Sequence, residues 1–515
     1  MTSLPRNLYR AAAVRALEDS AIDRSGLTGL ALMERAGQAA FAVQQQYWPS
    51  ARRMIVVCGP GNNGGDGFVV ARLAAAAGMA VEVVLLADSE RLSGAAAQAY
   101  ADMLAAGVTG QAFAAIDLNT ADILVDALFG TGLDRDIGGD LAVVIDALNA
   151  CRAPVLAVDI PSGLHADSGR VQGHVVLAAV TVSFVALKLG LLTGQGPACC
   201  GDLVFDDLQL SSDVGDGVPV AARRIDYAGV IATEDHPLVL RSRCAHKGNF
   251  GHVLVVGGDQ AMAGAVRMAA EAAARVGAGL VSVATRAEHA HQICAARPEL
   301  MVHGVVSAGV LLPLLAQATV VALGPGLGQQ GWGQECFSRV LEVAMAAAIP
   351  LVIDADGLNL LASDPCRYDH WLLTPHPGEA ARLLGVTTAE IQNDRLAAAQ
   401  AIQQRYGGVC ILKGAGTLIQ GGDLCWLCSD GNPGMASGGM GDVLSGVIAG
   451  LLAQGLALTD AAMVAVCLHA HAADEVAREG ERGMLAMDLM PMLRRLVNPV
   501  SAVLKSAEKA LVCDS

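Results

Sequence analysis

Short apolar runs alternate with helix-like segments along most of this chain of 515 residues. In the first half, the helix-like segments are residues 27–47, 67–78, 94–107 and 141–151, and the runs of strand length are residues 54–58, 81–86, 123–128 and 155–160. Strands that alternate with helices form a parallel sheet covered by helices on both faces. The pattern therefore predicts an α/β fold, and the length predicts more than one domain.

The same alternation returns in the second half, after a stretch in which it fades and Asp, Gly, Pro and Arg become common. A helix is predicted at residues 262–276, and strands are predicted at residues 252–256, 280–284, 319–323, 351–353, 372–374 and 409–412. We therefore expect two three-layer α/β domains, residues 1–215 and 235–505, joined by a linker at residues 216–234 with the boundary near residues 214–225.

Composition limits the partners and the compartment of the protein. A formal net charge of −16 argues against nucleic acid and anionic membranes, because both attract Lys and Arg. The apolar run at residues 175–187 contains Thr181 and Ser183, so it predicts a buried strand and not a membrane span. Residues 1–20 lack a secretory signal pattern, and thirteen cysteines without regular spacing fit reduced thiols. We therefore expect a cytoplasmic protein, with the pair Cys425 and Cys428 in core packing and not in a zinc site.

Three polar, glycine-rich loops follow strands of the first predicted sheet, at residues 59–67, 126–136 and 159–163. Because the carboxyl ends of parallel strands meet at one edge of a sheet, these loops predict a pocket there. Asn63, Asp126 and Ser162 supply oxygen atoms suited to a hard cation, and Asp159 could act as a general acid or base. Turn formation alone is the alternative explanation for each of these residues.

The loop sequences Gly-Asn-Asn-Gly-Gly-Asp-Gly, Phe-Gly-Thr-Gly-Leu and Asp-Ile-Pro-Ser-Gly resemble the epimerase domain of the NAD(P)H-hydrate repair enzymes over most of residues 10–210. The resemblance implies a Rossmann-like domain in which Asn63, Asp126 and Ser162 hold a potassium ion and Asp159 is catalytic. The implied substrate contacts are Asn62, Asn63, Gly64, Gly65, Asp66, Gly130, Thr131, Gly132, Leu133, Asp134, Arg135, Asp136 and Asp159. Lys188 either assists in the reaction or is a surface lysine that extends to solvent.

In the second half, residues 432–446 are rich in glycine and lead into an apolar helix with Asp442 in its first turn. Several backbone N–H groups and the helix dipole would favour an anion at this point, and we expect a phosphoryl group. A carboxylate beside such a guest repels it, which suggests that Asp442 has a chemical role. The alternative is an ordinary glycine-rich turn followed by an acidic first-turn residue.

The ordered loops at residues 324–328, 374–379, 413–417 and 439–442 resemble those of the ribokinase-like superfamily, and within it the nucleotide-dependent NAD(P)H-hydrate dehydratases, over residues 235–500. The resemblance implies a ribokinase-like domain that uses ADP with Mg²⁺, and Asp442 as the base. The implied nucleotide contacts are Lys413, Gly414, Ala415, Gly416, Thr417 and Gly441, and the implied substrate contacts are Ala265, Gly326, Gly328, His376 and Asp442.

Two residues of these loops leave questions open. Glu379 either helps to position Mg²⁺ or is only a first-turn acid of its helix. Met440 stands where the family has a small hydroxyl residue, so a side-chain contact to phosphate is absent while the backbone N–H groups remain.

Together the two resemblances imply one bifunctional enzyme, with hydrated NADH or NADPH and ADP as small-molecule partners. It would interconvert the R and S hydrates and dehydrate the S form by phosphorylating the C6 hydroxyl and expelling phosphate. Alternatives are a small-alcohol kinase with a fused ligand-binding domain and a dehydrogenase built on Gly59-x-Gly61-x-x-Gly64. No P-loop motif occurs, which argues against a P-loop NTPase. Alanine-rich helices favour a homo-oligomer.

Overall fold

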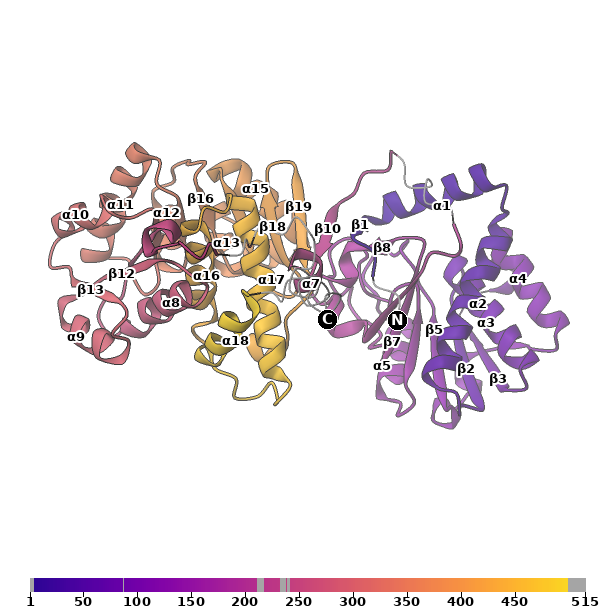
Figure 1. Cartoon of the computed structure of the whole chain (residues 1–515). Helices are drawn as coiled ribbons and strands as arrows, with labels where there is room; N and C mark the ends of the chain where they lie inside the picture. Colours follow the sequence, from indigo (N-terminus) through magenta and orange to yellow (C-terminus); the bar gives the residue numbers. More distant parts are fainter. Residues whose placement is uncertain (1–3, 87, 211–216, 232–237, 239–240, 499–515) are drawn as a thin grey trace, which may run out of the picture. The chain divides into compact units, whose positions relative to one another are not determined.

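The computed structural model describes residues 4–86, 88–210, 217–231, 238 and 241–498 (Figure 1). The chain forms two compact units, residues 1–224 and residues 225–515. Each unit consists of a sheet with helices packed against it, as the sequence predicts. Within the described residues, no helix combines the length and the apolar character needed to cross a bilayer.

The sheet of the first unit is parallel and has the strand order β4-β3-β2-β5-β6-β7-β9. The strands are β2 (Arg53–Cys58), β3 (Ala80–Leu85), β4 (Gly110–Gln111), β5 (Ile123–Ala127), β6 (Val155–Val158), β7 (Val180–Phe184) and β9 (Asp202–Asp206). From β2 the chain runs outward through β3 and β4, and it then returns to place β5 on the other side of β2. This order is that of a Rossmann-like sheet, whose ligands bind where the direction reverses, between β2 and β5.

Both faces of the first sheet are buried, because alternate residues of β2 enter different cores. Met54 and Val56 pack into the core that includes residues of α2, α3 and α4, whereas Ile55 and Val57 pack into the core beneath α5. From residue 29 onward, the helices are α2 (Gly29–Tyr47), α3 (Asn62–Ala76), α4 (Gly94–Ala105), α5 (Asp140–Ala150) and the short α6 (Gly196–Cys199). The first unit therefore has three layers.

The start of α3 differs from the prediction. We expected a loop as far as residue 67, but the helix begins at Asn62, so residues 62–66 form its first turn. The glycines there permit close packing and not a loop: a Cβ at Gly64 would lie 2.0 Å from the carbonyl oxygen of Gly59, and one at Gly65 would lie 2.5 Å from the side chain of Met33. Glycine lowers helix propensity, which explains why the sequence pattern indicated a loop.

Other element boundaries also differ between the prediction and the structure. The strand predicted at residues 155–160 ends at Val158, and the run at residues 175–187 provides β7 at its centre. The sequence did not predict β1 (Asn7–Tyr9) or α1 (Ala11–Ser25), nor that β1 pairs with β8 (Leu187–Lys188) and β10 (Ala222–Ile225). The proposed linker at residues 216–234 contains part of this structure, namely β10 and α7 (Tyr227–Ile231). Residues 211–216 and 232–237 of the linker region lie outside the described residues.

In the second unit the strand order is β13-β12-β11-β14-β15-β16-β17-β18-β19, parallel up to β17 and antiparallel beyond it. The strands are β11 (His252–Val256), β12 (Leu280–Thr285), β13 (Met301–Gly304), β14 (Val320–Leu323), β15 (Leu351–Ile353), β16 (Trp371–Leu373), β17 (Val409–Leu412), β18 (Thr417–Gly421) and β19 (Leu424–Cys428). The six strands predicted in this half are confirmed, with bounds within one residue.

The helices of the second unit form two layers, one on each side of its sheet. One layer contains α8 (Ala263–Arg275), α16 (Met440–Ala453), α17 (Leu458–Ala477) and α18 (Leu489–Leu496), and the other contains α11 (Trp332–Ala347), α12 (Asp356–Ser363), α13 (Pro377–Leu384) and α15 (Arg395–Tyr406). The remaining helices are α9 (Ala287–Ala296), α10 (Leu311–Leu315) and α14 (Thr388–Asn393). Gly446 of α16 lets this helix pack closely on α8, because a Cβ there would lie 2.0 Å from the carbonyl oxygen of Ala269.

Candidate active sites

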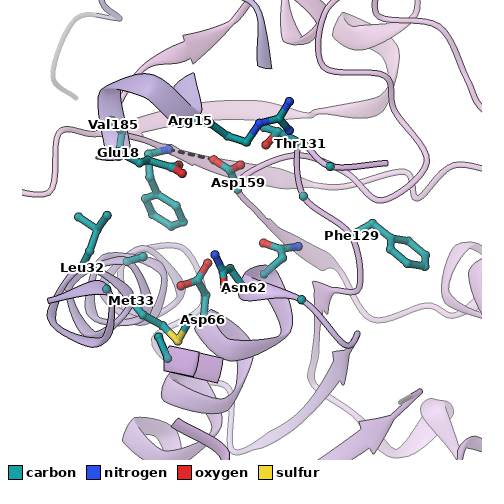
Figure 2. Close-up of a pocket in the computed structure, with 18 of the residues that line it drawn as sticks. Arg15, Glu18, Leu32, Met33, Asn62, Asp66, Phe129, Thr131, Asp159 and Val185 are labelled. Carbon is teal, nitrogen blue, oxygen red and sulfur yellow. Dashed lines mark hydrogen bonds between the residues drawn. The ribbon is translucent and has the colours of Figure 1, made fainter. Parts of the chain in front are cut away.

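The first unit contains a cavity of about 550 Å³ beside the carboxyl ends of β2, β5 and β6 (Figure 2). Its walls come from α1, α2, the first turn of α3 and the loops after β5 and β6. The predicted site residues that line it are Asn62, Asn63, Asp66, Gly130, Thr131, Gly132, Leu133, Asp134, Arg135 and Asp159. Gly64 and Gly65 pack the first turn of α3 against Gly59 and Met33. Asp136 faces Arg170, with 3.5 Å between the charged atoms.

Asp159 is held from several sides at the end of β6. Its backbone adopts the left-handed conformation, with φ of 69°, and its N–H donates to the carbonyl of Val182 at 2.7 Å. Its Oδ1 accepts hydrogen bonds from Nζ of Lys188 and, at 3.3 Å, from the N–H of Phe184. A non-glycine residue in this conformation costs on the order of 1–3 kcal/mol and persists only where its surroundings impose it. The side chain is therefore fixed toward the cavity.

Lys188 is fully buried, so the interpretation as a surface lysine is wrong. Its Nζ donates to Asp159 and also to Oγ of Ser183 and the carbonyl of Phe184, both at 3.1 Å. These three acceptors leave the ammonium group fully hydrogen-bonded. Lys188 thus compensates and orients the carboxylate of Asp159.

The three predicted potassium ligands differ in how their oxygen atoms are satisfied. Asp126 lies within β5 and not after it; its carboxylate accepts hydrogen bonds from Oγ and N of Ser162 at 2.6 and 2.8 Å. Burial raises the pKa of Asp126 to about 6, although these bonds oppose the shift. The buried side-chain amide of Asn63 has no hydrogen-bond partner among the described residues. An unsatisfied buried amide calls for a water or an ion, and amide, carboxylate and hydroxyl oxygens together suit a hard cation such as potassium.

In the second unit, Asp442 occupies the first turn of α16 as predicted. The helix begins after Gly439, whose φ of 91° lies in the left-handed region that favours glycine. Burial raises the pKa of Asp442 to about 7, and the neighbouring charge of Asp354 adds to this, while Lys413 opposes it. Met440 packs into the core of this unit, which explains how an apolar residue fits at a position beside the expected phosphate.

An ion pair between a buried carboxylate and a partly buried lysine lies beside this turn. Nζ of Lys413 donates to Oδ1 of Asp354 at 2.9 Å, and Ser445 donates to Oδ2 of Asp354 at 2.8 Å. Burial alone would raise the pKa of Asp354, but Lys413 and these hydrogen bonds lower it below its usual value. Sequence reasoning did not select Asp354 as a site residue, although its position directly after β15 was a usable signal.

His376 and Glu379 form a reciprocal cap at the start of α13. The N–H of His376 donates to Oε2 of Glu379 at 2.8 Å, and Nδ1 of His376 accepts from the N–H of Gly378 at 3.0 Å. The cap hydrogen bond uses Oε2 of Glu379, so this first-turn acid can cap the helix and also help to position Mg²⁺. The same carboxylate lies 3.9 Å from Nζ of Lys413, and burial raises its pKa to about 7.

The predicted nucleotide-binding loop at residues 413–417 rests on a buried arginine that sequence reasoning missed. Arg395 of α15 donates to the carbonyls of Leu412, Lys413 and Gly416 at 3.3, 3.3 and 3.5 Å. Gly414 has a φ of 139°, and a Cβ there would lie 2.9 Å from the Arg395 guanidinium. Arg395 therefore fixes the carbonyl side of the loop.

The remaining predicted residues lie at loops of the same unit. Ala265 and Gly326 meet, since a Cβ at Gly326 would lie 3.3 Å from that of Ala265, and the N–H of Gly328 donates to Asp356 at 2.9 Å. Cys425 and Cys428 are buried, and Sγ of Cys428 lies 3.7 Å from Sγ of Cys467, so this pair is in core packing as expected.

Comparisons with known proteins agree with both halves. Residues 29–190 match the family model described as YjeF-related protein N-terminus, and residues 253–495 match the one described as NAD(P)H-hydrate dehydratase. The chain is 50% identical over 494 residues to the bifunctional NAD(P)H-hydrate repair enzyme Nnr of Coxiella burnetii, covering 96% of this chain and 99% of the relative. It is 46% identical over 499 residues to that of Escherichia coli K12, covering 96% and 95%.

A solved structure of a ribokinase-like superfamily protein from Enterococcus faecalis V583 is 30% identical and has a TM-score of 0.50, covering 54% of this chain and 95% of that one. Fold and sites thus define a two-unit α/β enzyme, Rossmann-like and then ribokinase-like. Its near-complete alignment with the curated relatives makes the assignment specific: the chain belongs to the bifunctional NAD(P)H-hydrate repair enzymes. The family, fold and bifunctional activity expected from the sequence are confirmed.

Proposed function

We propose that the first unit interconverts the R and S hydrates of NADH and NADPH at Asp159, and that the second unit dehydrates the S form with ADP at Asp442. The observation that carries this division is the placement of Asp442. Its half-buried carboxyl group, with a pKa raised to about 7, lies in the first turn of α16 beside the Lys413–Asp354 pair. A base whose pKa is near the operating pH is best suited to take a hydroxyl proton.

Dehydration is difficult because hydroxide is a poor leaving group. Asp442 accepts the proton of the C6 hydroxyl group. The hydroxyl oxygen attacks the terminal phosphoryl group of ADP, and AMP departs. The C6–O bond then breaks with its electron pair on phosphate, the ring nitrogen supplies the pair for a C=N bond, and loss of a C5 proton gives NAD(P)H. N–H groups at residues 439–441 would stabilise the phosphoryl oxygens, and removing one such donor commonly costs ~10²–10³ in rate.

Each bound group has proposed holders. Lys413 and the loop that Arg395 supports hold the nucleotide, and Glu379 positions the Mg²⁺, which would offset the charge of the phosphoryl oxygens. In the first unit Asn63, Asp126 and Ser162 hold potassium, whose charge would help to bind and orient the hydrated nucleotide. There the C6 hydroxyl leaves and returns on the opposite face, with proton transfer at Asp159.

Recovery of absorbance at 340 nm from hydrated NADH tests the proposal. The S hydrate should give NADH with ADP, and the R hydrate should also give NADH because the same chain first converts it to the S form. ATP should support a lower rate than ADP. A stable phosphorylated product would instead indicate the small-alcohol kinase, and no recovery with either nucleotide would refute the proposal.

Compartment and assembly are a separate part of the proposal. The cysteines within the described residues are all free thiols, which supports a reducing compartment such as the cytoplasm. The homo-oligomer expected from the alanine-rich helices is to be tested by light scattering of the whole chain.

A further inference from the structure

Helix α1 brings a second carboxyl group to the cavity of the first unit. One face of α1 is buried through Val14, Leu17 and Ala21, which share a core with Ala186. The backbone N–H of Ala11, at the start of the helix, donates to Oδ1 of Asp167 at 2.6 Å. The helix is therefore fixed along its length, and Glu18 is held beside its buried face.

Glu18 lines the same cavity as Asp159, and the two side chains lie across the cavity from Asp66 and Asn62 (Figure 2). No strand-end loop or motif marks Glu18 in the sequence, and the helix that carries it was not predicted. The wall opposite α1 is the first turn of α3, where Asn63 is the proposed potassium ligand. Glu18 thus lies on the side of the cavity that holds the reacting carboxylate.

The carboxyl groups of Asp159 and Glu18 lie in different electrostatic surroundings. Asp159 accepts a hydrogen bond from Nζ of Lys188. Burial raises the pKa of Glu18 to about 7, and the charge of Asp159 raises it further than Asp19 does, while Lys188 and Arg15 oppose the shift. Burial raises the pKa of Asp66 on the opposite wall, and the charges of Asp159 and Glu18 raise it further. A pair of neighbouring carboxyl groups held in different environments can divide the roles of acid and base between them.

We propose that Glu18 is a catalytic acid of the epimerisation, donating the proton with which the C6 hydroxyl leaves, while Asp159 is its basic partner. This inference rests on the proposed epimerase function of the first unit. The C6–O bond breaks as the ring nitrogen forms a C=N bond, and the oxygen takes the Glu18 proton and leaves as water. Water adds to the opposite face of C6 and gives a proton to Asp159, and this proton then returns to Glu18.

The test uses the whole chain, and calorimetry checks that the first unit of each variant is folded. Glu18→Gln should lower the conversion of R to S hydrate, measured by NMR of the two epimers, by ~10²–10⁴. Dehydration of pure S hydrate should stay unchanged, because that reaction belongs to the second unit. Asp23→Asn, an exposed acid on the same helix, is the matched control and should epimerise like the wild type.

Two further measurements separate a chemical role from a structural one. The wild-type epimerisation rate should fall as the pH rises through about 7, where Glu18 loses its proton, and Glu18→Gln should lack this fall. Glu18→Asp, which restores an acid on a shorter side chain, should recover part of the rate. Glu18→Gln with at least a third of the wild-type rate, or Glu18→Asp no better than Glu18→Gln, would overturn the proposal for Glu18 alone. A wild-type chain without epimerisation would overturn the epimerase function itself.

Discussion

Nζ of Lys413 lies 2.9 Å from Oδ1 of Asp354, and a side chain at position 441 would lie 3.2 Å from the same Nζ. The ion pair therefore lies immediately beside the glycine that precedes Asp442. Burial raises the pKa of Asp442 most, the charge of Asp354 raises it further, and Lys413 lowers it. The pair thus adjusts the proton affinity of the proposed base without taking a proton itself.

Asp354→Asn should move the pH dependence of dehydration. Asp442 must be ionised to act as a base, so kcat/KM should rise with pH through about 7 in the wild type. Removing the Asp354 charge lowers the pKa of Asp442, so the rising limb should move to lower pH by on the order of one unit. The rate of NADH formation, followed by absorbance at 340 nm from about pH 5 to about pH 9, measures this shift. Asp364→Asn, an exposed acid of the same unit, should keep the wild-type profile, and an unmoved limb in Asp354→Asn would contradict the role of the pair.

The two activities should be separable by single substitutions. Asp442→Asn should lower nucleotide-dependent dehydration of the S hydrate by ~10²–10⁴ and spare epimerisation, because Asp442 and Asp159 belong to different units. Asp159→Asn should do the reverse. Each protein is assayed with separated R and S hydrates, and calorimetry checks that the unit carrying the substitution is folded. Loss of both activities in either folded variant would disprove this division of labour.

The position of each site residue in the chain decides whether it could be predicted from the sequence. Asp159 and Asp442 stand directly after an apolar run and at the start of an apolar helix, so strand-end and first-turn patterns mark them. Asp354 also follows a strand, but its role depends on Lys413, which lies 59 residues away. Sequence spacing does not show which of many distant charges become partners.

The failures have separate physical reasons. The burial of Lys188 depends on the pairing of β8 with β1 and on three acceptors around its Nζ, none of which a local pattern shows. The early start of α3 was not predicted because glycine has a low helix propensity. In the structure these glycines permit close packing on Gly59 and Met33. Tertiary contacts overrode local preference in both cases.

Arg395→Ala should weaken nucleotide binding more than it slows the chemical step. Arg395 donates to two carbonyls of the predicted nucleotide-binding loop and to that of Leu412, the last residue of β17, and each bond from a charged donor is worth about 1.5–3 kcal/mol. Partial loss of this support predicts a KM for ADP raised about tenfold or more, which corresponds to ~1.4 kcal/mol. Added guanidinium ion should recover part of the affinity by occupying the vacated space.

The control for Arg395 is Arg405 at the other end of α15, which donates to the carbonyl of Leu383 at 2.9 Å and does not touch the loop. Arg405→Ala should leave the KM for ADP near its wild-type value. Equal increases of KM in both variants, or an Arg395→Ala protein whose defect lies only in kcat, would show that Arg395 does not position the nucleotide.

Potassium should stabilise the first unit through Asn63. The buried amide of Asn63 has no hydrogen-bond partner among the described residues, so an ion that binds its oxygen removes a desolvation cost of the native state. At a concentration ten times the dissociation constant, potassium would add about 1.4 kcal/mol and raise the melting temperature by roughly 3–6 °C. Calorimetry of the whole chain in KCl and in NaCl of equal ionic strength measures the difference without any assay of activity. Asn63→Ala should lose the potassium-specific shift, whereas Asn62→Ala, at the exposed neighbouring position, should keep it. A wild-type protein that melts alike in both salts, or an undiminished shift in Asn63→Ala, would remove Asn63 from the proposed ligand set.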